Sequence, residues 1–251
     1  MIRIYDGNNY FRVAVERDPT GLAPRQILEE IKATKDVVIW VWDGKNGNSK
    51  RRELYPEYKR NRPPMAEDFR HAMQLMKDLL AHSTAIQIEV PGYEGDDVIA
   101  TLARRYSPVS IYSNDFDYMQ LVAERPGKVF CGANLKAGVE PKYVRLFKTL
   151  VGDPSDNIKG VKLFGKKTWD EADKEKLLEA VLRWVHQGVL LESDLPRSSM
   201  VDWVEDNLTL VRTYWQIVGF YDVPIDLIEE HTQRGSGDWY RAENLLSEFM
   251  L

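Results

Sequence analysis

Three carboxylates crowd into four positions at Glu94, Asp96 and Asp97, where the sequence predicts the start of a helix. Two unit negative charges about 4 Å apart repel by roughly 4 kcal/mol at an effective dielectric constant near 20. Acidic residues are favoured in a first helical turn because they face the positive end of the helix dipole, which would explain one or two of them. Three acids within four positions favour a second explanation, a site that holds a cation.

Four of the predicted strands are each followed by an aspartate or an acidic cluster, and a fifth is predicted around residues 129–131. The strand-like runs are residues 2–5, 37–42, 85–90 and 109–112, and the acids that follow them are Asp6, Asp43, the Glu94 cluster, and Asp115 with Asp117. Taken alone, Asp6 would be explained as a helix N-cap. Because the strands alternate with predicted helices, we expect a parallel, doubly wound sheet whose strand carboxyl ends lie along one edge. The acids should therefore converge there.

Segment 45–64 has no hydrophobic period and is rich in basic residues, asparagine and proline. Its cations are Lys45, Lys50, Arg51, Arg52, Lys59, Arg60 and Arg62. A solvated loop would explain such a run, but Tyr55 and Tyr58 lie among the cations. Phosphate neutralisation combined with base stacking uses this pairing of residue types. The segment is therefore a candidate nucleic-acid contact.

A second mixed stretch, Gly152–Lys167, carries two acids and a turn punctuated by glycines. The acids are Asp153 and Asp156, and the lysines are Lys159, Lys162, Lys166 and Lys167. Helix–turn–helix elements whose turn amides face a backbone phosphate have this composition. An ordinary connection between helices would also fit. From Lys174 onward the hydrophobic pattern is helical.

The bulk properties describe a globular protein of 251 residues, enough for one large domain or two small ones. A net charge of −5 argues at first sight against nucleic acid, but the basic residues are clustered, and bound divalent ions would offset clustered acids. The single cysteine, Cys131, excludes a disulfide framework and a thiolate zinc site. No apolar run approaches membrane length, and we expect a cytoplasmic protein.

The order of these motifs resembles the flap endonuclease, or 5′ nuclease, superfamily. It is most similar to the bacteriophage and bacterial 5′→3′ exonucleases, including the nuclease domain attached to bacterial DNA polymerase I. The resemblance covers about residues 1–170, and its least generic parts are Tyr55–Arg62 and Gly152–Gly165. It implies an α/β fold with a PIN-like parallel-sheet core, a helix-three-turn-helix element and a helical C-terminal region.

In domain terms, the resemblance implies a nuclease core over residues 1–150, with a basic arch or gateway at 45–64. Residues 151–251 would hold the helix-three-turn-helix element and the C-terminal helices, closely fused to the core. The sequence contains no repeat, and it has no low-complexity linker between the two parts.

The resemblance also implies roles for individual residues. The first metal site would be lined by Asp6, Asp43, Glu94, Asp96 and Asp115. The second would have Asp117, Asp153 and Asp156 nearby, with Asp97 as an additional acid. Catalysis would rest on Asp6, Asp43, Asp115 and Asp153 together with Lys59 and Arg62, which match basic residues over the scissile phosphate. Other DNA contacts would come from Arg12, Arg51, Arg52, Tyr58, Arg60, Lys159, Lys162, Lys166 and Lys167.

Three features depart from the family pattern. One is that Asn9-Tyr10-Phe11-Arg12 follows Asp6, which leaves open which aromatic residue would stack on an unpaired base. In the family, the backbone of one turn holds a monovalent cation, K⁺. The residues of this chain that match that turn are Ile158, Gly160, Val161 and Gly165. Family members usually have a second glycine where this chain has Leu163-Phe164. The interval between Asp43 and Glu94 is also short for a complete arch, so threading of a free 5′ end would be modified.

The expected chemistry follows from the ligand types. Carboxylate oxygens without histidine or thiolate suit Mg²⁺ or Mn²⁺. Two such ions about 4 Å apart would activate water and stabilise the leaving 3′ oxygen in an in-line displacement. The family resemblance, in turn, implies that the substrate is DNA with a 5′ end, flap or nick, with RNA in a hybrid as an alternative, cut by a monomeric enzyme in replication or repair.

Other functions remain open at this point. A haloacid-dehalogenase-like phosphatase needs Asp-x-Asp after its first strand, whereas this chain has Asp6-Gly7-Asn8. A receiver domain would carry its acidic pair at the first strand, not after the third. A structure-specific DNA-binding protein without catalysis could use the same fold, although the full set of acids argues against it.

Overall fold

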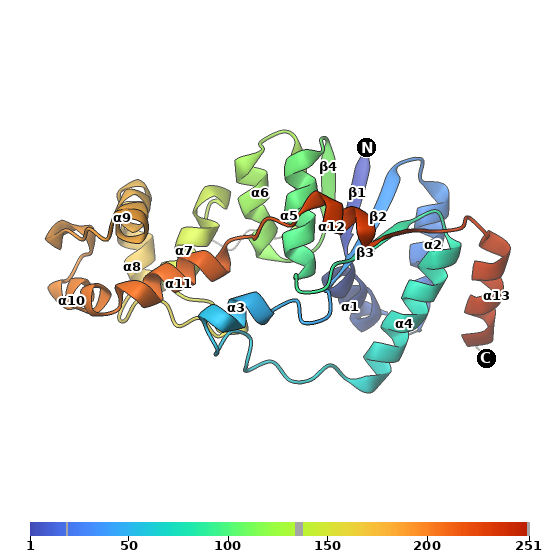
Figure 1. Cartoon of the computed structure of the whole chain (residues 1–251), viewed down its shortest axis with the longest axis horizontal. Coiled ribbons are helices and arrows are strands. Elements are labelled where there is room, and N and C mark those ends of the chain that lie inside the picture. Colours follow the sequence, from blue (N-terminus) through green and yellow to red (C-terminus); the bar gives the residue numbers. More distant parts are fainter. Residues whose placement is uncertain (19, 134–137, 250–251) are drawn as a thin grey trace. The chain divides into compact units, whose positions relative to one another are not determined.

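Short apolar runs form a six-stranded sheet with the order β5-β4-β1-β2-β3-β6. The computed structural model describes residues 1–18, 20–133 and 138–249 (Figure 1). The strands are β1 (Ile2–Asp6), β2 (Val37–Trp42), β3 (Ile86–Glu89), β4 (Val109–Tyr112), β5 (Val129–Cys131) and β6 (Thr232–Arg234). The first five run parallel, and β6 pairs antiparallel with β3. The predicted α/β class with a parallel sheet is confirmed.

The chain divides into two compact units. The sheet unit comprises residues 1–47, 64–134 and 221–251, and the helical unit comprises residues 48–63 and 135–220. The predicted boundary at residue 150 therefore needs correction, because the chain enters and leaves the helical unit twice. Residues 221–251 return to the sheet unit, where β6 pairs with β3 and a C-terminal helix packs on an earlier helix.

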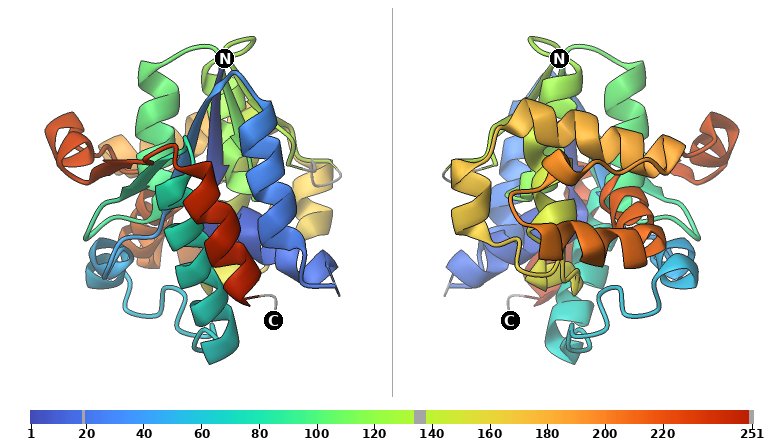
Figure 2. Two further views of the ribbon diagram at one scale, coloured as in Figure 1. Left: turned by 90° about the vertical axis from the view of Figure 1, so that its right-hand side faces the viewer. Right: turned by 90° about the vertical axis from the view of Figure 1, so that its left-hand side faces the viewer.

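Helices cover both faces of the sheet in the sheet unit. They are α1 (Gly7–Arg17), α2 (Ala23–Ala33), α4 (Glu67–His82), α5 (Gly95–Arg105), η1 (Phe116–Tyr118), α6 (Met119–Glu124), α12 (Ile225–Glu230) and α13 (Trp239–Phe249). Tyr5, Trp40 and Trp42 pack with α1, α2 and α4 on one face, and α5 packs against β1 and β2. Figure 2 shows α2, α4 and α13 side by side.

The helical unit is built around three helices, α7, α9 and α11, that contact one another. Its elements are α3 (Ser49–Leu54), η2 (Pro141–Tyr143), α7 (Val144–Leu150), η3 (Pro154–Asp156), α8 (Lys166–Glu171), α9 (Lys174–Gln187), η4 (Glu192–Asp194), α10 (Ser198–Asp206) and α11 (Leu208–Val218). Trp169 and Trp184 are fully buried there. Within the described ranges, no helix is long and apolar enough to cross a membrane.

The basic segment 45–64 is not the solvated loop that its composition suggested. It contains α3, and the side chains of Arg51 and Tyr58 are each only 2% exposed. Arg51 donates from Nε to the Ile217 carbonyl oxygen at 2.9 Å and from Nη2 to that of Gly219 at 3.1 Å. Ile217 lies in the last turn of α11 (Leu208–Val218) and Gly219 is its C-cap, and a helix leaves carbonyl acceptors unsatisfied at this end. The predicted DNA contacts of Arg51 and Tyr58 are therefore corrected to packing within the helical unit.

Candidate functional site

Asp6 joins the end of β1 to the start of α1 and does two things there. Its Oδ1 accepts a hydrogen bond from the backbone N–H of Asn9 at 3.1 Å, so it is the helix N-cap. Its Oδ2 accepts from Ser113 Oγ at 3.0 Å and from the Tyr118 hydroxyl at 3.1 Å. The N-cap explanation is correct, and the same carboxylate also faces residues that follow β4.

Four carboxylates share one electrostatic environment at this edge of the sheet. Burial, then the charge of Asp43 and also that of Asp115, raise the pKa of Asp6 to about 7. Burial, followed by Asp6, Asp96 and Asp115, raises the pKa of the Tyr118 hydroxyl well above its ordinary value. Such mutual effects require short separations. The predicted convergence of the strand-end acids is thus present within the sheet unit.

Asp43 is held against the start of α5 by backbone contacts. Its Oδ1 accepts from the N–H of Gly95 at 2.7 Å, and its own N–H donates to Asn8 Oδ1 at 3.0 Å. A Cβ atom on Gly95 would lie 3.3 Å from Asp43 Oδ1 and 3.4 Å from the Trp42 carbonyl carbon. The glycine therefore permits the close approach of β2 and α5.

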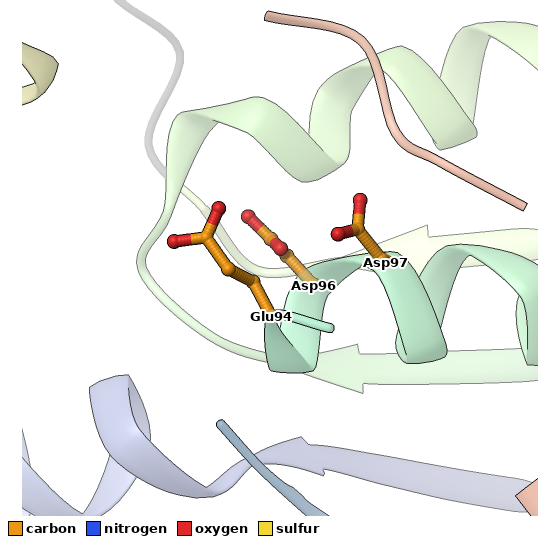
Figure 3. A group of neighbouring side chains, drawn as sticks. All are labelled: Glu94, Asp96 and Asp97. Atoms are coloured by element: carbon orange, nitrogen blue, oxygen red, sulfur yellow. The ribbon is translucent and has the colours of Figure 1, made fainter. Parts of the chain in front are cut away.

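The acidic cluster of Glu94, Asp96 and Asp97 is a compact group of oxygen donors. One carboxylate oxygen from each of Glu94, Asp96 and Asp97 lies within 4.8 Å of the others. Figure 3 shows the three side chains at the N-terminal end of α5, with Glu94 at the N-cap and Asp96 and Asp97 in the first turn. Glu94 is 6% exposed and Asp97 is fully buried. Two buried carboxylates and a half-buried one, with no nitrogen or sulfur donor among them, fit a hard divalent cation.

Asp97 also has a structural role that the sequence did not indicate. Its Oδ1 accepts from the backbone N–H of Tyr221 at 2.8 Å, at the point where the chain returns to the sheet unit. A second hydrogen bond nearby joins the Val223 N–H to Thr101 Oγ1 at 3.0 Å. Part of the carboxylate of Asp97 therefore holds the returning chain against α5.

Asp115 and Asp117 follow β4 in a short 3₁₀ turn. Asp115 caps this turn, because its Oδ1 accepts from the N–H of Asp117 at 2.9 Å. The N–H of Asp115 in turn donates to Ser113 Oγ, the hydroxyl that bonds Asp6. Asp115 thus lies with Asp6, and Asp117 follows it around the turn.

Asp153 and Asp156 belong to the helical unit, where each has a basic partner. Lys148 Nζ lies 2.7 Å from Asp153 Oδ2, and both side chains are almost completely buried. Burial alone would raise the pKa of Asp153, but the Lys148 ammonium and hydrogen bonds from Ser155 lower it to about 2. Arg62 Nη2 lies 2.6 Å from Asp156 Oδ1. The sequence analysis missed Lys148, whose only signal was a lysine within the apolar helix α7.

The basic segment is tied to residues 153–158, which we call the acidic turn. The Lys59 N–H donates to the Asp156 carbonyl at 3.0 Å, and Asn61 Nδ2 to that of Pro154 at 2.9 Å. In the opposite direction, Asn157 Nδ2 donates to the Glu57 carbonyl at 2.8 Å. Lys59 and Asn157 both have positive φ angles, 53° and 60°. Lys59 therefore has a defined position, unlike a residue of a solvated loop.

The other predicted contact residues divide by exposure. The exposed cations are Arg12, Arg52, Arg60, Arg62, Lys159, Lys162, Lys166 and Lys167. Arg60 pairs with Glu57 at 2.8 Å, and Arg12 lies over the ring of Phe69. Ile158 and Val161 are buried, each 3% exposed. Gly160 has a φ angle of 69°, and a Cβ there would approach the Leu150 carbonyl oxygen to 2.5 Å.

Comparison with known proteins agrees with this architecture. Residues 23–144 match the family model described as 5′-3′ exonuclease, N-terminal resolvase-like domain. A 5′-3′ exonuclease of Aquifex aeolicus is 30% identical over 239 residues, which are 89% of this chain and 79% of that protein. The chain belongs to the 5′-3′ exonuclease family.

Two further comparisons bear on the extent of the likeness. The thermostable DNA polymerase I of Thermus thermophilus is 40% identical over 156 residues, 57% of this chain. The chain matches only about a fifth (19%) of that polymerase. The bacteriophage T5 D15 flap endonuclease, solved as a variant in a pseudo-enzyme–product complex with DNA and metal ions, superposes with a TM-score of 0.61. The two are 19% identical, 98% of each chain is covered, and the likeness shows a common fold.

Proposed function

We propose that this protein is a divalent-metal-dependent 5′→3′ exonuclease and flap endonuclease that hydrolyses DNA phosphodiesters. The observation that carries the proposal is the convergence of Asp6, Asp43, Asp96 and Asp115 from separate strand ends of a 5′-3′ exonuclease family chain. Holding carboxylates beside one another costs stability unless a cation offsets their charge. The convergence of these four carboxylates in a chain of this family therefore supports a metal centre.

The donor set favours Mg²⁺ or Mn²⁺ over zinc, because every candidate ligand is a carboxylate oxygen. Glu94 and Asp96, with Asp6, Asp43 and Asp115, would hold the first ion. Bound divalent ions supply an activated water and stabilise the leaving oxygen. The N–H groups of Gly95 and Asn9 hold Asp43 and Asp6 in place before any ion arrives.

Asp117, Asp153 and Asp156 are proposed to serve a second ion. Asp153 and Asp156 already face Lys148 and Arg62. A second ion would therefore compete with existing cations, and we expect it to bind more weakly than the first. Lys148 keeps Asp153 ionised to low pH, because the pKa of that carboxyl lies near 2.

Lys59 and Arg62 are proposed to stabilise negative charge that develops on the phosphoryl oxygens. Both lie in the segment that is hydrogen-bonded to the acidic turn, and Arg62 also donates from Nε to the Ser155 carbonyl oxygen at 3.2 Å. These contacts reduce the motion of the two cations before substrate binds. Preorganised cations cost little rearrangement when the transition state forms.

DNA is the proposed partner because exposed lysines follow the acidic turn. Lys159, Lys162, Lys166 and Lys167 can neutralise phosphates of a duplex, and the related T5 structure contains DNA. The turn from Ile158 to Gly165 is proposed to hold K⁺ through its backbone carbonyls. An RNA–DNA hybrid is an alternative substrate, and we propose that the protein acts as a monomer.

Cleavage of a 5′-flapped duplex in Mg²⁺ tests the proposed function. We expect products with a 5′-phosphate and a 3′-hydroxyl, and no cleavage after chelation of the metal. Asp115→Asn should abolish cleavage while binding of flap DNA in Ca²⁺ remains, because the acids serve chemistry and the lysines serve positioning. Asp170→Asn, at an exposed acid of α8, is the matched control and should cleave normally. Binding without any Mg²⁺- or Mn²⁺-dependent cleavage would make the protein a non-catalytic DNA-binding member of the fold.

A further inference from the structure

A groove of about 520 Å³ runs beside the acidic edge of the sheet unit. It lies between α1 and the strands β4 and β5, and none of the roles proposed above uses it. Its volume is within the range of small-ligand sites, roughly 300–1,000 Å³. Residues of three kinds line it: the aromatic rings of Tyr10, Tyr112 and Phe130, the guanidinium of Arg17, and polar groups of Ser113 and Asn114.

One end of this groove is lined by a residue that is hydrogen-bonded to Asp6 of the candidate metal centre. Ser113, which lines the groove, donates to Asp6 Oδ2 at 3.0 Å. Asn114, also in the lining, has its N–H bonded to Asn9 Oδ1 at 2.9 Å, in the first turn of α1. Any molecule that fills this end therefore lies next to the carboxylates.

The other end of the groove carries a positive charge. Arg17 is in the last turn of α1, ten residues beyond Gly7, which places it about 15 Å along the helix from the acidic edge. It is exposed, and no ion pair of Arg17 occurs within the part of the chain that the structure describes. A groove that is acidic at one end and cationic at the other matches a ligand with an uncharged head and an anionic tail.

The walls between these ends suit nucleobases. Phe130, on the edge strand β5, is 48% exposed. Tyr10 and Tyr112 are half-buried and contact each other edge to face. Aromatic side chains with a nearby cation are the means by which proteins bind single-stranded nucleic acid without sequence preference.

We propose that this groove binds the one- or two-nucleotide fragment on the 5′ side of the cut. The uncharged 3′-hydroxyl of the fragment would lie at the acidic edge, its bases against Phe130 and the tyrosines, and its 5′-phosphate at Arg17. This inference rests on the proposed nuclease function and adds a subsite to it. The groove retains a short product or the end of the displaced strand.

The chain supplies its own probe, because its single cysteine lines the groove. Cys131 is half-buried, and burial, the main cause, raises the pKa of its thiol to about 11, so alkylation by iodoacetamide is slow and is best followed at pH 9. The ligand is 5′-phosphorylated dithymidylate, added to the full chain in EDTA at fixed salt. We expect it to slow alkylation of Cys131 in a saturable manner, and dithymidylate without the 5′-phosphate to protect less.

Two variants test the contacts. Arg17→Ala should raise the dinucleotide concentration for half-protection about tenfold, the loss expected for one charge-assisted hydrogen bond. Phe130→Ser should raise it at least about fivefold, the lower end for one base–aromatic stack. Arg105→Ala is the matched control, because Arg105 is also exposed in the last turn of a sheet-unit helix but does not line the groove.

The outcomes separate this inference from the nuclease assignment. Flap cleavage in Mg²⁺ is measured in parallel on the same preparations. Protection without cleavage would support a nucleotide site while removing the proposed nuclease function. Cleavage without protection, or equal protection in Arg17→Ala and Arg105→Ala, would overturn the groove as a nucleotide subsite.

Discussion

At the residue scale, Asp6 is the N-cap of α1, accepts hydrogen bonds from two hydroxyl groups, and has a carboxyl group with a raised pKa. Its folded pKa of about 7 lies well above its ordinary value of 3.8. Between these values the folded protein keeps a proton that the unfolded chain has lost. The free energy of unfolding should therefore fall as the pH rises from about 4 to 7 in the absence of divalent metal.

Thermal melts in EDTA at pH 5, 6, 7 and 8 check this expectation. The midpoint should fall with pH, and Mg²⁺ should restore it most at pH 8, because the cation offsets the ionised carboxylates. Asp6→Asn is the control, since asparagine still caps α1 but does not titrate. An equally steep fall in that variant would assign the effect to other groups.

Lys59 is the cation that we expect to matter most for rate. Lys59→Ala should lower single-turnover cleavage at saturating enzyme by about 10²–10³, the usual loss for one preorganised charge partner. Lys59→Gly distinguishes the effect of losing the ammonium from an effect on backbone conformation, because glycine adopts the φ of 53° without strain. It should lose activity equally. Lys50→Ala, in the same segment, is the control, and a similar small loss in all three variants would leave only general phosphate binding.

The acids could be predicted from the sequence, whereas several basic residues could not be placed. Strand-end aspartates are visible because a charge interrupts an apolar run, and Asp6, Asp43 and Asp115 lie as expected. Arg51 and Lys148 are hidden from such reasoning, because charged residues are normally exposed and burial depends on a partner distant in sequence. The positions of the strand-end acids could therefore be anticipated from the sequence better than those of the buried cations.

At the scale of elements, α3 is held by its buried arginine to the end of α11. Arg51→Ala would leave the carbonyls of Ile217 and Gly219 without this donor. We expect a loss of about 3 kcal/mol in the free energy of unfolding of the helical unit, as for hydrogen bonds to a buried charge. Arg60→Ala, at an exposed ion pair, should change stability by less than about 0.5 kcal/mol.

Chemical denaturation measures the stability difference, and flap binding in Ca²⁺ measures the alternative role. A stable Arg51→Ala protein with weakened DNA affinity would restore Arg51 as a DNA contact.

The boundaries of short elements could not be predicted from the sequence. A six-residue helix such as α3 is too short to display a hydrophobic period, so its residues were indistinguishable from a loop.

At the scale of the whole molecule, metal binding should affect the two units at different concentrations. Asp6 of the sheet unit accepts hydrogen bonds from two hydroxyl groups, whereas Asp153 and Asp156 face cations. Amide exchange should therefore slow in β1 and β4 at lower Mg²⁺ than in the acidic turn. Hydrogen exchange with mass spectrometry at increasing Mg²⁺ measures the order, with α9 as the control element. Protection of the acidic turn first would reverse the assigned strengths of the two sites.

The late return of the chain to its sheet has a consequence for biosynthesis. While the ribosome makes residues 135–220, β3 has not yet received β6, and its unpaired edge can template association with other chains. At about 5–20 residues per second this interval lasts on the order of ten seconds. The hydrogen bond from the Tyr221 N–H to Asp97 also cannot form until this last segment has been made. Translation that stops within the helical unit would therefore release an aggregation-prone polypeptide and not a smaller working enzyme.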